Sequence, residues 1–116
     1  MPSETTPILG ITQLESGQSQ PEVPVNQGIR ILEAYAQLSV KSRSVSTPPG
    51  SPAEGDRYIC GEDSLGDWAG KDDQVAVLIG GAWSFLVPQE GWIAWIKSES
   101  KHVKYLEGSP QGWFDL

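Results

Sequence analysis

The sequence is poor in the side chains from which most catalytic and metal sites are built. Its 116 residues include one cysteine, Cys60, and one histidine, His102. One cysteine cannot form an internal disulfide, and one cysteine with one histidine falls short of the ligands of a structural zinc site. No nucleophile, base and orienting group recur in a recognisable pattern. We therefore expect no enzymatic activity, no metal and no cofactor.

Positive charge and long apolar runs are scarce as well. Eight lysines and arginines oppose fifteen acidic residues, for a formal net charge of −7. Because nucleic-acid binding depends on clustered Lys and Arg, a nucleic-acid partner is not expected. The chain contains no run of 18 apolar residues and does not begin like a signal peptide. We expect synthesis in the cytosol and no membrane insertion.

Residues 1–24 combine prolines with Ser, Thr, Gln and Glu, a composition that buries too little apolar surface to fold alone. One apolar cluster interrupts this segment, and it consists of Ile8, Leu9, Ile11 and Leu14. The segment is either a flexible tail or an extended arm that docks on a neighbouring subunit or partner. We favour the docking arm, because a solvated tail gains nothing from four clustered aliphatic side chains.

Residues 25–43 have the apolar spacing of an amphipathic helix. One stripe repeats every three or four residues and comprises Val25, Ile29, Leu32, Ala36 and Val40. Asn26 is the expected N-cap, with Pro24 outside the helix. The stripe either packs on the rest of the domain or forms the seam of a homo-oligomer. Both arrangements are compatible, and we take these five residues as a candidate oligomer interface.

The remainder of the chain reads as a connector followed by a small β domain. Residues 44–56 are rich in proline and serine, and we interpret them as an ordered loop. Over residues 57–116, short β-prone runs at 57–60, 74–79, 82–87, 92–96, 102–106 and near 113–114 alternate with turn residues. Gly80-Gly81 marks a tight hairpin turn. The prediction is an α+β fold with an extended arm, one helix, and a small antiparallel sheet or open barrel of short hairpins.

The residues with intrinsic reactivity have ordinary structural interpretations. Cys60 ends an apolar strand, so we expect a buried small hydrophobe. His102 stands among Lys and Ser, so we expect it to be solvated. The acidic residues between 62 and 73 lack the ligand spacing of a calcium loop, and we interpret them as solvated carboxylates.

The five tryptophans carry the open question about function. A small β domain needs bulky side chains to fill its core, yet tryptophan is also typical of binding surfaces. Alternation places Trp92 and Trp95 on opposite faces of one strand, so at least one should face outward or a subunit seam. Four tryptophans form a candidate ligand platform: Trp68, Trp92, Trp95 and Trp113.

Several segments together resemble the family of unknown function DUF2793. They span 26–40, 51–58, 68–70, 81–83 and 88–92, within a similarity over about residues 9–113. Members occur in tail-fibre and other appendage proteins of phages, prophages and gene transfer agents. The chain departs from the family at 16–21, where a Gln-Ala-Gln-Lys sequence is usual, and at Lys71, where a histidine is common. These departures bear on charge-dependent partner contacts and not on the fold.

The resemblance implies a structural virion protein, such as a fibre, spike or adaptor component. We expect a homo-oligomer, with a trimer favoured, that contacts other virion proteins. It would assemble in the bacterial cytoplasm and reside in the virion. The alternative is a receptor-binding module that recognises host cell-surface carbohydrate through exposed tryptophans.

Overall fold

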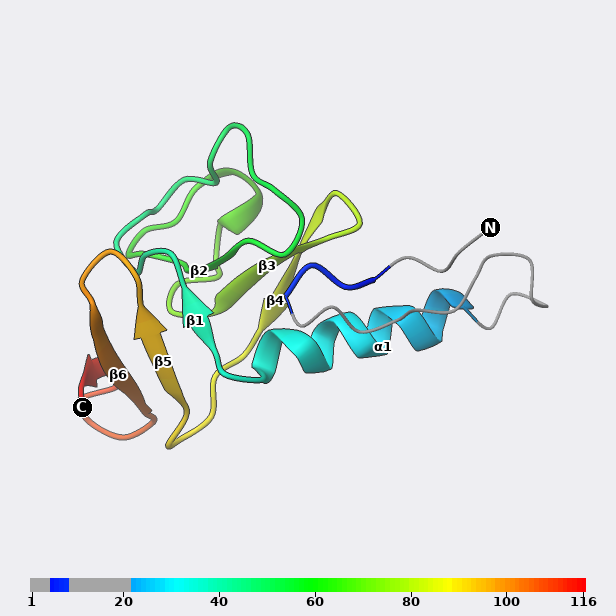
Figure 1. Cartoon of the computed structure of the whole chain (residues 1–116). Coiled ribbons are helices and arrows are strands. Elements are labelled where there is room, and N and C mark those ends of the chain that lie inside the picture. Colours follow the sequence, from blue (N-terminus) through cyan, green and yellow to red (C-terminus); the bar gives the residue numbers. More distant parts are fainter. Residues whose placement is uncertain (1–4, 9–21) are drawn as a thin grey trace. The chain divides into compact units, whose positions relative to one another are not determined.

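A computed structural model of the chain describes residues 5–8 and 22–116 (Figure 1). The chain divides into two compact units, residues 1–36 and 37–116. Among the described residues, no helix has the length and apolar character needed to cross a membrane.

The first unit contains the helix α1 (Glu22–Tyr35). Pro24 lies in its first turn, where backbone N–H groups have no partner within the helix, so the missing N–H costs little. Near the N-terminus of the chain, the Thr6 hydroxyl donates a hydrogen bond to the Glu33 carboxylate, and both side chains are buried. This hydrogen bond joins Thr6 to α1.

The second unit holds seven strands in two sheets (Figure 1). One sheet has the order β2 (Arg57–Ile59), β3 (Val75–Ile79) and β4 (Ala82–Leu86), all antiparallel. The other has the order β1 (Ser39–Val40), β5 (Ile93–Ile96), β6 (Lys101–Leu106) and β7 (Gly112–Asp115). Its pairs are antiparallel except that β1 runs parallel to β5.

The two sheets are joined by the residues that follow β1. The Lys41 amide donates to the Arg57 carbonyl at 2.8 Å, and the Ile59 amide donates to the Ser42 carbonyl at 3.0 Å. One short segment thus pairs with β5 through β1 and then with β2. The sheets meet along this segment without closing into a barrel.

The β3–β4 hairpin turns at Gly80 and Gly81. Both have positive φ, 63° and 79°, as a two-residue hairpin turn of the primed type requires. The Glu54 carboxylate accepts hydrogen bonds from both glycine amides at 2.9 Å. A side chain from the preceding loop therefore caps the turn and fixes its position.

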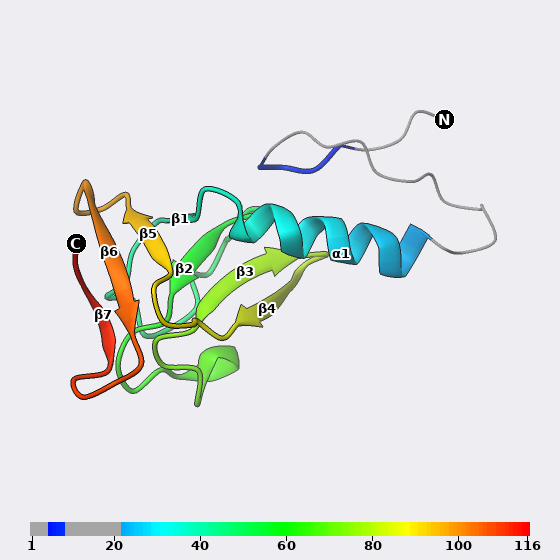
Figure 2. The same cartoon turned by 90° about the horizontal axis from the view of Figure 1, so that it is seen from below.

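Successive side chains along each strand point to opposite faces of its sheet, so each sheet has one face toward the core and one outer face. Apart from Arg57, the buried faces of both sheets are aliphatic or aromatic: Val40, Ile59, Val75, Val77, Leu86, Ala94, Ile96, Val103, Tyr105 and Trp113. The opposite face of the three-stranded sheet carries Tyr58, Ala76 and Phe85 in one cross-strand row. That face is covered by the short 3₁₀ helix η1 (Gly66–Trp68), whose green turn lies near the β3–β4 hairpin in Figure 2.

An ion-pair network ties the ends of the four-stranded sheet together. The Arg43 guanidinium donates to both carboxylate oxygens of Glu99, at 2.8 and 2.9 Å. The ammonium nitrogen of Lys101 lies 3.3 Å from a carboxylate oxygen of Glu99 and 3.1 Å from one of Asp115. The hydrogen bond from Arg43 lowers the pKa of Glu99, with Lys101 adding to the effect. Residues from three separate segments are thereby held at one edge.

The α+β class and the run of short antiparallel hairpins are confirmed. Two predictions about the helix are wrong. It begins at Glu22, so Asn26 is not its N-cap, and it ends at Tyr35 instead of Arg43. Gln37 has a φ of 45°, a left-handed conformation that stops the helix. The next residues pair with β5 instead: the Trp95 amide donates to the Leu38 carbonyl at 3.0 Å.

Candidate functional site

The predicted oligomer stripe is divided between two elements. Val25 and Ile29 lie in α1, and Leu32 lies there with 70% of its side chain exposed. Ala36 follows the helix and is half-buried. Val40 lies in β1 and is fully buried, so it cannot belong to an exposed helical seam. The prediction for Val40 was wrong because the helix ends at Tyr35. Apolar spacing alone does not distinguish a further helical turn from the start of a strand.

The predicted docking arm is described only at its start. Ile8 is half-buried. Leu9, Ile11 and Leu14 lie outside the described residues, and their docking remains a prediction.

The predicted tryptophan platform is partly wrong. Trp68 is fully buried and Trp113 is buried, and the Trp113 indole N–H donates to the Asp73 carbonyl at 2.9 Å. Neither can stack on a ligand from solvent. Trp92 and Trp95 are half-buried, and the Trp95 ring meets the exposed His102 ring edge-on at 4.8 Å. The four tryptophans therefore do not form one surface.

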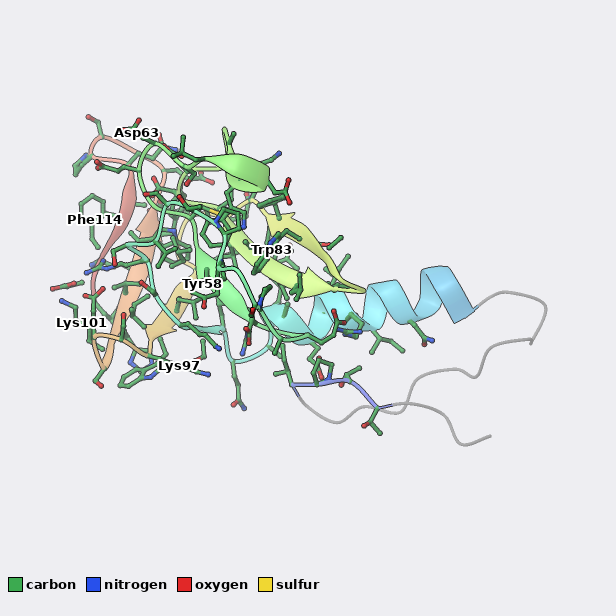
Figure 3. All side chains as sticks on the ribbon, turned by 90° about the horizontal axis from the view of Figure 1, so that it is seen from above. Tyr58, Asp63, Trp83, Lys97, Lys101 and Phe114 are labelled. Atoms are coloured by element: carbon green, nitrogen blue, oxygen red, sulfur yellow. The ribbon has the colours of Figure 1, made fainter. Side chains whose placement is uncertain are left out.

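A different aromatic group forms on the outer side of the three-stranded sheet. The rings of Tyr58, Trp68 and Trp83 contact one another, with centroids 5.3–6.2 Å apart and tilted or edge-on geometry. Cys60 and Ala76 complete the cluster beneath them. Figure 3 labels Tyr58 and Trp83, which project from the strands of this sheet. We call these three rings the aromatic triad.

A groove runs beside the aromatic triad. Its volume is about 690 Å³, within the range of ligand-binding clefts. The sheet contributes Leu78, Ala82, Trp83 and Phe85, the hairpin turn contributes Gly81, the connector contributes Pro48, Pro49 and Pro52, and η1 contributes Asp67. The residues that line the groove are mostly apolar, and Asp67 contributes the one carboxylate among them. Sequence reasoning missed it, because the prolines of the connector carried only a turn signal.

The walls of the groove are held by backbone hydrogen bonds. The Gly61 amide donates to the Val45 carbonyl, the Leu65 amide to the Ser46 carbonyl, and the Gly55 amide to the Leu78 carbonyl, each at 2.8 Å. The Ser46 hydroxyl donates to the Glu62 carbonyl at 2.7 Å. The connector is therefore an ordered loop fixed at both of its ends.

Cys60 and His102 are placed as the sequence indicated. Cys60 is fully buried, and burial raises the pKa of its thiol to about 12, with the charge of Asp72 adding to the effect. The thiol thus stays protonated near neutral pH, which does not suit a nucleophile. His102 is exposed on β6.

The acidic loop performs structural work through Asp72. Its carboxylate accepts hydrogen bonds from the amides of Asp63 and Ser64 at 2.9 and 3.0 Å, and these bonds lower its pKa. Asp73 has its pKa raised, first by burial and then by the charges of Asp72 and Glu62. Within residues 5–8 and 22–116, no group of three His, Cys, Asp or Glu side chains is placed to hold a metal ion.

Within the described residues the fold is α+β, with one α-helix and a β unit of two sheets whose own loops shape a groove. A family model described as "Protein of unknown function (DUF2793)" matches residues 25–113. The chain belongs to this family. Neither a curated protein nor a solved structure matches it significantly.

Proposed function

We propose that the chain is a structural component of a phage or phage-like particle, a fibre, spike or adaptor protein that assembles as a homo-oligomer through α1. The expectation that members of the family occur in phage appendage proteins supplies the biological context. Symmetric oligomers are the common form of soluble multi-subunit proteins, and a trimer is the state we favour.

The observation that carries the proposal is the apolar surface left open on α1. Leu32 is 70% exposed and Tyr35 is 41% exposed. Residues three apart lie on one helix face, and Ile29 continues the same row toward the N-terminus. A row of large apolar side chains on one helix is stabilised when a second helix covers it.

Contacts with other virion proteins are assigned to the arm at Ile8, Leu9, Ile11 and Leu14. In this scheme the oligomer assembles in the bacterial cytoplasm and ends in the virion. Antibodies against the purified protein should label released particles, and particles without label would contradict that location.

The solution mass tests self-association directly. Multi-angle light scattering of the 12.6 kDa chain at micromolar concentration should return about three times that mass. Leu32→Glu preserves helix propensity but places a charge in the row, so it should reduce the mass to that of one chain. Leu65→Glu is the matched control, because Leu65 is a 61% exposed leucine in a loop of the β unit.

The control variant should retain the oligomer mass, and far-UV circular dichroism should show equal helix content in both variants. A wild-type protein that is monomeric at these concentrations would exclude the helix seam. An oligomer that survives Leu32→Glu but dissociates with Leu65→Glu would move the interface to the β unit.

A further inference from the structure

We infer that the groove beside the aromatic triad is a binding site for a neutral saccharide. This role goes beyond the proposed self-association and does not depend on it, because every lining residue of the groove lies between Pro48 and Phe85. The inference rests on three properties of the groove: an oriented ring, an acceptor at the margin, and rigid walls.

Trp83 supplies the ring. Its indole is half-buried, so part of it stays open to solvent beside the groove. Trp68 meets it edge-on at 5.3 Å and Tyr58 meets it edge-on at 6.2 Å. Because these contacts fix the ring before any ligand arrives, little side-chain entropy is lost on binding. A pyranose offers an apolar face of C–H groups that can pack on such a ring.

Asp67 supplies the polar recognition. Its side chain is exposed at the margin of the groove, and an ionised carboxylate can only accept hydrogen bonds. The prolines of the wall have backbone carbonyl oxygens, which accept hydrogen bonds, but no backbone N–H groups to donate them. A ligand that fits must therefore bring hydrogen-bond donors together with an apolar face, and sugar hydroxyls on a pyranose ring do both.

The same chemistry separates a saccharide from other occupants. A proline-rich peptide would match the apolar floor, but its prolines bring no N–H for Asp67. An acidic sugar would meet the Asp67 carboxylate in a chain of net charge −7. The Lys71 ammonium lies 5.2 Å from the centroid of the Phe85 ring, which lines the groove. The Asp67 carboxylate and the negative net charge of the chain therefore favour a ligand without charge.

The walls are set before binding. Three prolines with fixed φ form one side, and hydrogen bonds at Gly55, Gly61 and Leu65 anchor that loop. A saccharide would therefore enter a formed cleft instead of ordering a loose one. Low ordering cost matters here, because a single sugar ring buries little surface.

The test follows the indole N–H resonances of the full chain by two-dimensional NMR. The probes are the methyl pyranosides of glucose, galactose, mannose and N-acetylglucosamine, with glucuronic acid as the charged counterpart and decaproline as the peptide probe. At least one neutral pyranoside should shift the Trp83 indole resonance saturably, and the Trp95 resonance should stay unchanged. Glucuronic acid should bind about tenfold more weakly than methyl glucoside.

Two variants locate the site. Asp67→Asn should weaken binding of the active pyranoside by roughly tenfold, because a charged acceptor is replaced by a neutral one. Asp63→Asn makes the same change in a nearby loop outside the groove lining and should leave binding unchanged. Trp83→Leu should abolish the shift, with amide spectra reporting whether the fold is retained.

The inference is overturned if no neutral pyranoside produces a saturable Trp83 shift at concentrations up to roughly 50 mM. It is also overturned if decaproline alone shifts this resonance, which would make the groove a peptide site. A pyranoside that binds equally well to wild type and Asp67→Asn would exclude the assigned acceptor. None of these results bears on the oligomer mass, so the two proposals fail independently.

Discussion

The two sheets of the β unit differ in how far the aromatic side chains at their outer faces are buried. In the three-stranded sheet, η1 and the connector loop cover the outer face, and Trp68 becomes a core residue there. In the four-stranded sheet, the outward row carries Trp95 and His102, with Ile93 50% exposed beside them. Both sheets bury their other face. The outer face of a sheet is thus buried only where another segment covers it, as η1 and the connector cover the three-stranded sheet.

Truncation of one tryptophan at the outer face of each sheet should give the largest contrast. Trp68→Ala removes a fully buried side chain and two ring contacts, so we expect a loss of about 3–5 kcal/mol in the free energy of unfolding. Trp95→Ala removes a half-buried ring, with an expected loss of about 1 kcal/mol. Urea unfolding followed by circular dichroism measures both. Equal losses would mean that the outward face of the four-stranded sheet is covered in solution.

The covering loop itself is tested at Gly61. A Cβ there would lie 2.8 Å from the Ser46 hydroxyl oxygen and 3.0 Å from the Val45 carbonyl oxygen. Gly61→Ala must therefore push the connector away from the sheet, at an expected cost of about 1–3 kcal/mol. Gly50→Ala is the control in the same connector, since a Cβ there meets nothing within 4 Å. A neutral Gly61→Ala would show that the loop moves freely and that the groove wall is not fixed.

The acidic loop should respond to Asp72→Asn with a smaller loss than Gly61→Ala. The substitution weakens the two hydrogen bonds that the carboxylate accepts from the amides of Asp63 and Ser64. Because these bonds lower the pKa of Asp72, its stabilisation is present above the unfolded value of about 3.9 and is lost as pH falls through the folded value. Wild type and variant should therefore differ at pH 7 and converge in acid, measured by urea midpoints across pH.

Local patterns predicted the elements that depend on local chemistry. Gly80-Gly81 marked its hairpin, because two consecutive positive φ values favour glycine at both positions. The end of α1 escaped prediction, because residues 38–40 continue an apolar spacing that suits a helix yet pair with β5. The groove escaped for a related reason. It joins residues 48–52, 67 and 78–85, and no single segment of the sequence carries a signal for that meeting.

Asp73→Asn should change the free energy of unfolding the least, and it should stabilise the protein where Asp72→Asn destabilises it. Its pKa is raised by burial and by the charges of Asp72 and Glu62, so the folded chain binds this proton more tightly than the unfolded chain. The corresponding stability is fully present below the unfolded pKa and is lost as pH rises through the folded value. Asp73→Asn should thus gain a few tenths of a kcal/mol at pH 7, allowing for solvent screening, and nothing near pH 3.

The backbone permits this substitution, because Asp73 has a φ of 67° and asparagine adopts that left-handed conformation readily. Asp63→Asn is the matched control, since Asp63 has a φ of 52° and an exposed side chain, and it should give no gain. A gain at Asp63 equal to that at Asp73 would mean that general relief of net charge is responsible. A gain at Asp73 alone would show that the loss of stability at pH 7 comes from the carboxylate of Asp73 itself, the residue whose carbonyl accepts the Trp113 indole hydrogen bond.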